Sequence, residues 1–290
     1  MAKRPNDFTP KTHFRGYAIP GPAAPGAEES STLALDENES LDALCGHFRI
    51  FQLRNGHRFS TDDLLVAWYG TTWCPTAHRI LDLGSGIGTV ATVAAWRLPG
   101  ASLVTVEAQS TSVALARKSV RWNGLESRVD LREGDFRESS VLSSDEVFDL
   151  VLGSPPYFPL GTGELGDHPQ KVACRFEVRG DIRDYCRVAA EHLRIGGVFS
   201  CVFPINPEDQ AKRVERAAGE AGLVIVRYRP IVFREGQDPL LGVFLMMRSV
   251  DLPETMRQST WQEPPLMIRD RDGQVHPEYA AVKISFGFPP

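Results

Sequence analysis

The sequence predicts an α/β fold built on one open, mostly parallel sheet. Three observations support this prediction: strand and helix patterns alternate from about residue 79 to residue 248, the first of these strands runs into a glycine-rich turn, and a later strand ends at two prolines. In open α/β sheets, ligands bind at the carboxyl edge of the strands. We therefore expect both turns to lie at one edge and to form the functional site.

The glycine-rich turn follows a short apolar strand, Arg79–Leu83, and precedes a helix pattern over Thr89–Leu98. Glycines allow the backbone to pass close to a ligand, and here they occupy every second position of the turn. Thr89 stands where a dinucleotide-binding fingerprint has its third glycine. The spacing therefore argues against a nicotinamide cofactor.

Acidic residues mark the ends of neighbouring strands. Asp82 precedes the first glycine, and Glu107 ends the next predicted strand, where it is placed to accept both ribose hydroxyls of a cofactor. Asp135 and Phe136 follow the third strand. This order resembles the S-adenosylmethionine site of methyltransferases, in which the last pair meets the adenine ring. The candidate cofactor-binding residues are Asp62, Asp82, Gly84, Ser85, Gly86, Gly88, Glu107, Ala108, Asp135 and Phe136.

A second signature, Ser154-Pro155-Pro156-Tyr157, ends the predicted buried strand 147–152. Proline cannot continue a sheet ladder, so the strand stops in a rigid, extended turn. The turn offers a hydroxyl, free carbonyls and an aromatic ring, which suit a flat amino-bearing group. It resembles motif IV of the amino-methyltransferases, and these four residues are the candidate catalytic residues. In isolation, the same residues would more often be a strand-ending loop with a packed tyrosine.

The segment before the α/β pattern is expected to form a hairpin and a helix. The apolar run Phe48–Leu53, an Asn-Gly pair at 55–56 and residues 57–59 predict a hairpin with a type I′ turn. Ser60 is the expected N-cap of the next helix, with Asp63 in the capping-box position. Asp62 lies at the helix start, where it would favour the helix dipole or bind the ammonium of a cofactor's methionine moiety.

Length and composition predict the domain organisation of the chain and the compartment in which it works. The 290 residues divide into a flexible tail over 1–45, a hairpin and helix over 46–75, a main domain over 76–250 and a C-terminal extension over 251–290. Five cysteines without a C-x-x-C pair fit a reducing cytoplasm and argue against a zinc site, and we expect no metal. Without a signal sequence or an apolar run of membrane-spanning length, we expect a soluble, cytoplasmic protein.

A more specific resemblance begins at Gln52 and continues through residues 56–65. This segment resembles bacterial tRNA (adenine-N6)-methyltransferases that modify the adenine beside the anticodon of a valine tRNA, and the similarity extends through 81–86, 147–157 and 266–273 to Tyr279. It implies a Rossmann-like class I methyltransferase fold with a mostly parallel seven-stranded sheet and helices on both faces. It also implies S-adenosylmethionine as the donor and an exocyclic amine of RNA, in a tRNA, as the acceptor.

Two positions depart from that family. Asn is usual where this chain has Ser154, and the Ser form is typical of DNA enzymes that methylate cytosine N4, so adenine and cytosine both stay open. In the segment Ala173–Glu177, Phe176 replaces a usual histidine. Arg175 and Glu177 are retained, either as an ion pair or because Arg175 contacts RNA.

Basic residues follow the Ser-Pro-Pro-Tyr turn, within a predicted substrate loop over 158–180 and beyond it. The net charge of −5 does not indicate a nucleic-acid binder, but local clustering matters more. Each of these residues alone could be solvated or ion-paired, whereas the set is expected to contact RNA phosphates. The set comprises Lys171, Arg175, Arg179, Arg183 and Arg187, with Arg227, Arg229 and Arg234 on or beside a later strand. Phe158, Arg175, Arg179 and Arg183 are the candidate substrate-binding residues, and Phe158 joins Tyr157 as a stacking wall for an unpaired base.

Together these features predict an S-adenosylmethionine-dependent N-methyltransferase that acts on an RNA base, with adenine N6 in tRNA as the leading substrate. Three alternatives stay open: methylation of glutamine N5 in a protein, methylation of cytosine N4 in a nucleic acid, and a non-catalytic cofactor- or RNA-binding protein in which Ser154 marks lost activity.

Overall fold

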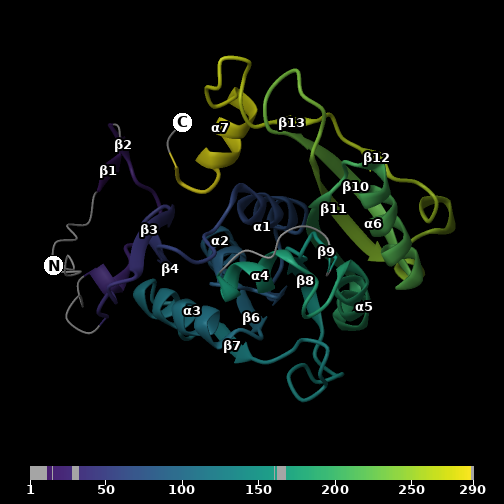
Figure 1. Cartoon of the computed structure of the whole chain (residues 1–290). Helices are drawn as coiled ribbons and strands as arrows, with labels where there is room; N and C mark the ends of the chain where they lie inside the picture. The colour runs from purple at the N-terminus through teal and green to yellow at the C-terminus, as the bar shows by residue number, and fades with distance from the viewer. Residues whose placement is uncertain (1–11, 15, 28–32, 160, 162–167, 289–290) are drawn as a thin grey trace.

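The computed structural model describes residues 12–14, 16–27, 33–159, 161 and 168–288, and a nine-stranded sheet forms its centre (Figure 1). In spatial order the strands are β12 (Trp261–Gln262), β10 (Leu223–Val232), β11 (Leu241–Arg248), β9 (Leu193–Pro204), β8 (Phe148–Gly153), β5 (Arg79–Leu83), β6 (Ser102–Glu107) and β7 (Val129–Glu133), and β13 (Leu266–Met267) also pairs with β10. Only β11 runs antiparallel to its neighbours in this described sheet. The expected mostly parallel seven-stranded sheet, β5 to β11, is confirmed, and two short strands extend it.

Helices cover both faces of the sheet because successive residues of a strand point to opposite sides. Leu150 and Leu152 of β8 pack with residues of α1 and α2, whereas Val151 between them packs with residues of α5 and α6. The helices are α1 (Thr61–Trp73), α2 (Thr89–Arg97), α3 (Ser110–Trp122), α4 (Pro169–Arg175), α5 (Ile182–His192), α6 (Glu208–Glu220) and α7 (Pro277–Ile284), with 3-10 turns at Pro25–Ala27, Ser249–Asp251 and Glu254–Met256.

The N-terminal hairpin has a different partner strand from the expected one. β4 (Phe48–Leu53) pairs antiparallel with β3 (Glu39–Cys45), which precedes it, and not with residues 57–59. β3 contributes the fully buried Leu44, which the polar segment after the Asn-Gly pair cannot match. The Asn-Gly pair therefore does not mark the turn of this hairpin. The prediction of a flexible tail over 1–45 is wrong from residue 39 onwards, where β3 begins.

Part of the segment before β3 is also attached to the body of the protein. Ala24 and Gly26 are buried, and a Cβ at Gly26 would lie 2.7 Å from the Cα of Trp122 in α3. The expectation of a loosely attached tail is wrong for this segment, because a residue without a side chain allows close packing on a helix. For residues 1–11, 15 and 28–32 the same expectation lies outside the described part of the chain.

Helix α1 begins where the sequence indicates. The backbone N–H of Ser60 donates to Asp63 Oδ2 at 3.0 Å, and the reciprocal bond completes the capping box. The C-terminal extension lies beside this helix (Figure 1), and the Tyr69 hydroxyl of α1 donates to Glu263 Oε1 of the extension at 2.7 Å. No helix in the described residues is both long and apolar enough to span a membrane.

Candidate active site

A cavity of about 410 Å³ opens at the carboxyl edge of β5, β6 and β8. It brings together both signatures found in the sequence. The predicted residues that line it are Asp62, Asp82, Gly84, Ser85, Gly86, Glu107, Ala108, Asp135, Phe136, Ser154, Pro155, Pro156, Tyr157, Phe158, Arg175 and Arg179. Of the candidates, Gly88 and Arg183 are not among its lining residues.

The glycine-rich turn leaves one wall of the cavity open to a ligand. Gly84 and Gly86 have φ values of 61° and 55°, in the left-handed region that other residues rarely adopt. A Cβ at Gly84 would clash with the hydroxyl of Tyr185, whereas no atom lies within 4 Å of the corresponding position at Gly86. The turn therefore needs glycine for its conformation at both positions and for close packing at the first.

Glu107 is held in place by the backbone of that turn. Its Oε2 accepts from Gly86 N at 2.8 Å, and its Oε1 accepts from Gln109 N at 2.7 Å. Each carboxylate oxygen has a second lone pair, so both can accept a further bond from a vicinal diol. Burial raises the pKa of this carboxyl, and its backbone hydrogen bonds and the charge of Arg179 oppose that shift.

Asp82, which lines the cavity, also stabilises the start of α2. Its Oδ2 accepts from Ala91 N at 3.1 Å, and the side chain is only 1% exposed. Burial raises the pKa of this carboxyl well above its usual range. The residue thus orients the helix whose N-terminus follows the glycine turn.

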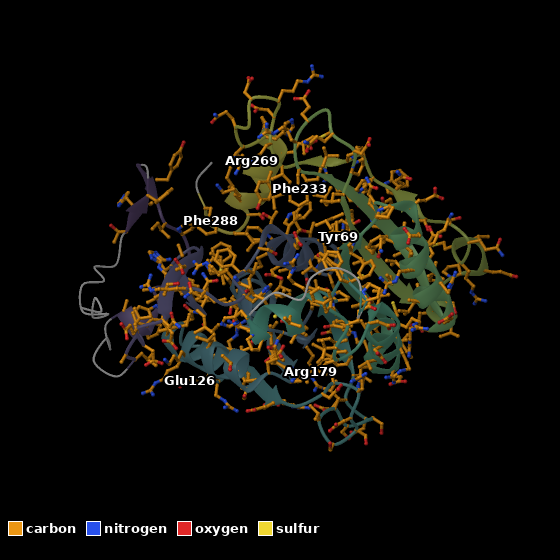
Figure 2. The ribbon with its side chains drawn as sticks, in the orientation of Figure 1. Tyr69, Glu126, Arg179, Phe233, Arg269 and Phe288 are labelled. Carbon is orange, nitrogen blue, oxygen red and sulfur yellow. The ribbon has the colours of Figure 1, made fainter. Side chains whose placement is uncertain are left out.

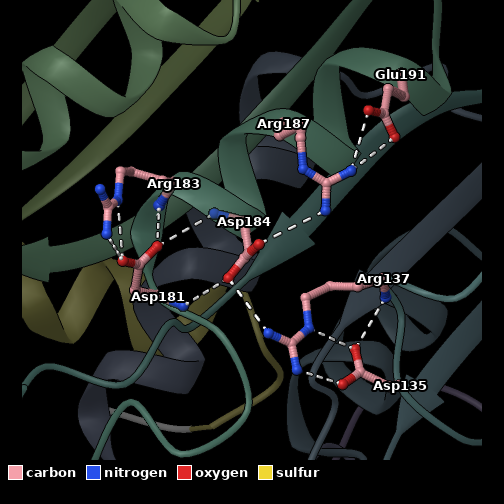
Figure 3. Close-up of polar contacts among 7 residues, drawn as sticks. All are labelled: Asp135, Arg137, Asp181, Arg183, Asp184, Arg187 and Glu191. Carbon is pink, nitrogen blue, oxygen red and sulfur yellow. Dashed lines mark hydrogen bonds and ion pairs between the residues drawn. The ribbon is translucent and has the colours of Figure 1, made fainter. Parts of the chain in front are cut away.

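Asp135 has an unexpected partner. Both of its oxygens accept hydrogen bonds from the Arg137 guanidinium, at 2.6 Å and 2.9 Å, and this pairing lowers the pKa of the Asp135 carboxyl (Figure 3). Phe136 is buried edge-on against Tyr185, with ring centroids 4.8 Å apart. Asp135 faces the cavity, but any bond it makes to a ligand would be shared with Arg137.

One of the catalytic candidates, Tyr157, contacts the first turn of α1. The Tyr157 hydroxyl donates to Asp62 Oδ2 at 2.8 Å, which joins the Ser-Pro-Pro-Tyr turn to the helix. Burial, together with the neighbouring Asp63 carboxylate, raises the pKa of Asp62 to about 6, although the bond from Tyr157 lowers it. The Tyr157 ring also packs edge-on against Phe203, at 5.7 Å between centroids.

The mouth of the cavity is formed by Phe158 and helix α4. Phe158 is 41% exposed, and the Arg175 guanidinium lies 5.6 Å from its ring centroid. Helix α4 was not expected within the predicted substrate loop, of which residues 160 and 162–167 lie outside the described part. Gln170 fixes this helix by accepting from His57 N at 2.9 Å and donating to Ser112 at 3.0 Å.

Of the two alternatives for Arg175 and Glu177, an ion pair or an RNA contact of Arg175, the ion pair is not found among the contacts of the described residues. Glu177 pairs with Arg213 of α6, which also donates to the carbonyl of Tyr157 at 3.4 Å. Phe176, which stands where the family that this segment resembles usually has a histidine, is 4% exposed. Its ring packs against that of Phe158, with 5.8 Å between the ring centroids. Arg175 is consequently left facing the cavity mouth.

The other arginines of the predicted RNA-contacting set differ in their surroundings. Figure 3 shows Arg183 paired with Asp181 at 2.8 Å, and Arg187 paired with Asp184 and Glu191 along α5. Arg179 lines the cavity, and Figure 2 places it on the opposite side of the view from Arg269 in the C-terminal extension. The structure therefore brings only part of the basic set to the site.

The arginines of the late strand β10 are engaged elsewhere. Arg227 pairs with Glu263 at 3.1 Å and lies 3.5 Å from the ring centroid of Trp73, at the far end of α1 from Asp62. Arg229 donates to the carbonyl of Pro264 at 3.1 Å. They do not line the cavity that contains Ser154.

Several lining residues were not identified from the sequence. His57, Gln109, Cys174 and Tyr185 all face the cavity, and they come from four separate segments. His57 and Cys174 lie in segments that carry the family resemblance, 56–65 and 173–177, whereas Gln109 and Tyr185 belong to no such segment. Only the placement of these segments and of α5 around the cavity could have indicated all four.

The comparisons agree with this geometry. The methyltransferase small domain family matches residues 62–166. The chain is 29% identical over 194 residues to a tRNA1(Val) (adenine(37)-N6)-methyltransferase of Bacteroides thetaiotaomicron, covering 66% of this chain and 77% of the relative. A protein of the same name from Shewanella amazonensis is 29% identical over 78% of this chain and 90% of its own length. The chain is an S-adenosylmethionine-dependent methyltransferase, and its residues 62–166 match the methyltransferase small domain.

Other relatives broaden the comparison. A release factor glutamine methyltransferase of Gloeobacter violaceus is 32% identical over 42% of this methyltransferase and 44% of its own chain. A solved structure from Agrobacterium tumefaciens, described as a predicted O-methyltransferase, covers 78% of this chain and 96% of its own, at 19% identity and a TM-score of 0.56. That likeness supports the Rossmann-like methyltransferase fold.

The cavity fits the cofactor that this family uses. Glu107 presents two backbone-anchored oxygens for a ribose diol, the glycine turn leaves room beside them, and the buried Phe136 ring lies at the same end. S-adenosylmethionine supplies an activated methyl group on a sulfonium when it is bound.

Proposed function

We propose that this enzyme methylates the exocyclic amine of an RNA base, namely adenine N6 in a tRNA. The observation that carries the proposal is the Ser-Pro-Pro-Tyr turn, which lines the cavity beside an exposed aromatic ring and the Arg175 guanidinium. A flat base can stack on an aromatic side chain while a guanidinium contacts its phosphate. The relatives from Bacteroides and Shewanella, whose names specify adenine N6 in a tRNA, support the same substrate class.

The chain's own residues would activate the acceptor without a metal ion. An exocyclic amine is a weak nucleophile because its lone pair is delocalised into the ring. Hydrogen bonds from its N–H groups to Ser154 Oγ and the Pro155 carbonyl favour a tetrahedral nitrogen, whose lone pair is then localised. Positioning and exclusion of water supply most of the rate.

The remaining candidates divide between the two ends of the cavity. At the cofactor end, Glu107 binds the ribose, Asp135 and Phe136 meet the adenine, and the free oxygen of Asp62 binds the ammonium. At the substrate end, Phe158 and Tyr157 form the stacking wall, and Arg175 contacts the RNA backbone. Arg179, predicted as a substrate-binding residue, lines the cavity, and its charge opposes the rise in the pKa of Glu107 that burial causes and adds to the lowering of the Asp135 pKa that is due mainly to Arg137; we therefore assign Arg179 to the cofactor end.

A second function has a specific observation in its favour. The similarity to release factor glutamine methyltransferases spans 129 residues, and a glutamine side chain presents an NH₂ group much like that of adenine. That match covers less than half of this chain, whereas the tRNA methyltransferase from Shewanella matches over 227 residues. The wider match favours RNA.

The test is methyl transfer from labelled S-adenosylmethionine to three substrates: bulk tRNA, RNase-treated tRNA and a release-factor domain. We expect label in intact tRNA, and N6-methyladenosine after digestion to nucleosides. N4-methylcytidine would keep the RNA and the reaction type but overturn adenine as the base. Label in the release factor alone would replace RNA by protein as the substrate, and no label in any acceptor with normal cofactor binding would indicate a binding protein. A tRNA substrate would also place the protein in the cytoplasm.

A further inference from the structure

The Ser-Pro-Pro-Tyr turn depends on another segment of the chain for its position. Pro155 and Pro156 have no N–H, so neither can donate a hydrogen bond to a neighbouring segment. The next donors along the chain are the N–H groups of Tyr157 and Phe158, and both donate to the carbonyl of Arg175, at 3.2 Å and 3.1 Å. The segment that follows helix α4 therefore holds the turn in place.

That segment is joined to the turn at a second point. The N–H of Glu177 donates to the carbonyl of Phe158 at 2.9 Å, and Phe158 forms a parallel β-bridge with Phe176. The turn and residues 175–177 thus form one hydrogen-bonded unit. This unit carries both the proposed stacking wall and the guanidinium at the mouth of the cavity.

Arg213 of α6 attaches this unit to the body of the protein. Its guanidinium pairs with the Glu177 carboxylate and also makes a longer bond, of 3.4 Å, to the carbonyl of Tyr157. The same group lies 5.3 Å from the centroid of the Phe203 ring and donates to Gln210 Oε1 at 3.1 Å. The side chains of the ion pair are only 24% and 11% exposed, so solvent screens their attraction less than on an open surface.

We propose that Arg213 is a positioning residue, which acts mainly through Glu177 to hold the Ser-Pro-Pro-Tyr turn where methyl transfer requires it. This inference rests on the proposed amine methylation at that turn. The acceptor nitrogen must lie in line with the sulfonium methyl, and a misplacement of about 1 Å can reduce the rate about 100-fold. Arg213 is not among the described residues that line the cavity, so its effect on the reaction is indirect.

Hydrogen exchange tests whether Arg213 holds the turn, and this measurement needs no substrate. Arg213→Met removes the charge and keeps an unbranched side chain. We expect the amides of Tyr157, Phe158 and Glu177 to exchange about 10-fold faster in this variant, because their hydrogen bonds open more often. Arg216→Met, at an exposed position of the same helix, is the matched control and should leave these amides unchanged. Unchanged exchange in Arg213→Met would overturn the proposal.

Kinetics test whether this positioning serves the reaction. Well below the unfolding temperature and at saturating cofactor, we expect Arg213→Met to lower kcat about 10- to 100-fold, with a much smaller change in the KM of the acceptor and in cofactor affinity. Arg213→Lys keeps the charge that pairs with Glu177 but loses the planar fork, so it should lower kcat by less than about 5-fold. A lower unfolding temperature with an unchanged kcat in Arg213→Met would show a purely structural role and overturn the proposal.

A double-mutant cycle tests whether Arg213 acts through Glu177. Glu177→Gln removes the partner charge, and in that background Arg213→Met should change kcat by less than about 3-fold. A loss as large as in the natural chain would overturn the proposed route. The double variant leaves no buried charge of this pair without its partner, so its exchange and its kcat decide the case if Arg213→Met alone does not fold.

The same experiments separate this proposal from its premise. The kinetic assays use whichever amine substrate becomes labelled, tRNA or release factor. Absence of label in every acceptor would remove the proposed function, and hydrogen exchange would still decide whether Arg213 holds the turn. Active enzyme with unchanged exchange and unchanged kcat in Arg213→Met would keep the proposed function and remove the positioning role.

Discussion

The two ends of the cavity are built in different ways. The proposed cofactor end is formed by the carboxyl ends of consecutive parallel strands, and its Glu107 is fixed by the backbone N–H groups of Gly86 and Gln109. The substrate end combines the turn after β8 with helix α4. If the proposed assignment of the two ends holds, the residues for the cofactor are specified by strand ends and the turns that follow them, whereas those for the substrate depend on contacts between distant segments.

The largest expected effect comes from Ser154, and it tests whether residues of the substrate end contribute to the methyl-transfer step without contributing to cofactor binding. Ser154→Ala removes the acceptor for the amine, and we expect kcat to fall by about 10² to 10³, the usual effect of losing one transition-state hydrogen bond. Cofactor affinity should be unchanged. Single-turnover kinetics and calorimetry measure the two quantities, and a loss of cofactor binding would show that the ends are not independent.

The converse substitution tests the cofactor end. Glu107→Ala removes two charge-assisted hydrogen bonds to the ribose, so cofactor binding should weaken by about 1.5 to 3 kcal/mol. RNA affinity, measured without cofactor, should stay the same. Glu107→Gln is the matched control, because it keeps the size of the side chain and one acceptor oxygen and should have an intermediate effect. Unchanged affinity in Glu107→Ala would remove the ribose assignment.

A smaller effect separates arginines at the mouth from those on α5. Arg175 faces the cavity beside Phe158, whereas Arg183 is paired with Asp181. Arg175→Ala should weaken RNA binding about 3- to 10-fold and reduce the salt slope by about one phosphate contact. Arg183→Ala is the control and should leave the salt slope unchanged. Equal effects of both substitutions would favour a diffuse basic surface over a defined mouth.

What the sequence could predict follows the same division. The parallel sheet, the glycine turn and the carboxylate of Glu107 were predictable because short motifs combine with strand order to specify them. The partner of β4 was not, since Asn-Gly is a strong hairpin signal and the competing strand carries only scattered apolar residues. The partners of Glu177 and Asp135 were also missed, because both depend on which of several nearby arginines lies closest in space.

The smallest expected effect concerns the stability of the protein without cofactor. Burial raises the pKa values of Asp62 and Asp63 to about 6, above the usual value of 3.8. A carboxyl whose pKa is raised in the folded state binds more protons there than in the unfolded chain. Each therefore makes the folded state more stable as the pH falls from about 7 towards 5.

From pH 7.5 to pH 5.5 we expect each of these two groups to add about 0.5 to 1 kcal/mol to the free energy of unfolding, measured in urea. Asp62→Asn should remove its share of the increase, because the amide does not titrate. Bound S-adenosylmethionine should also reduce the increase, since its ammonium would favour ionised Asp62 and lower the pKa of that carboxyl. If the full increase survives in Asp62→Asn and is insensitive to cofactor, the proton uptake attributed to Asp62 occurs elsewhere. In that case Asp62, at the start of α1, would not bind the ammonium of the cofactor, and the start of α1 would not belong to the cofactor end.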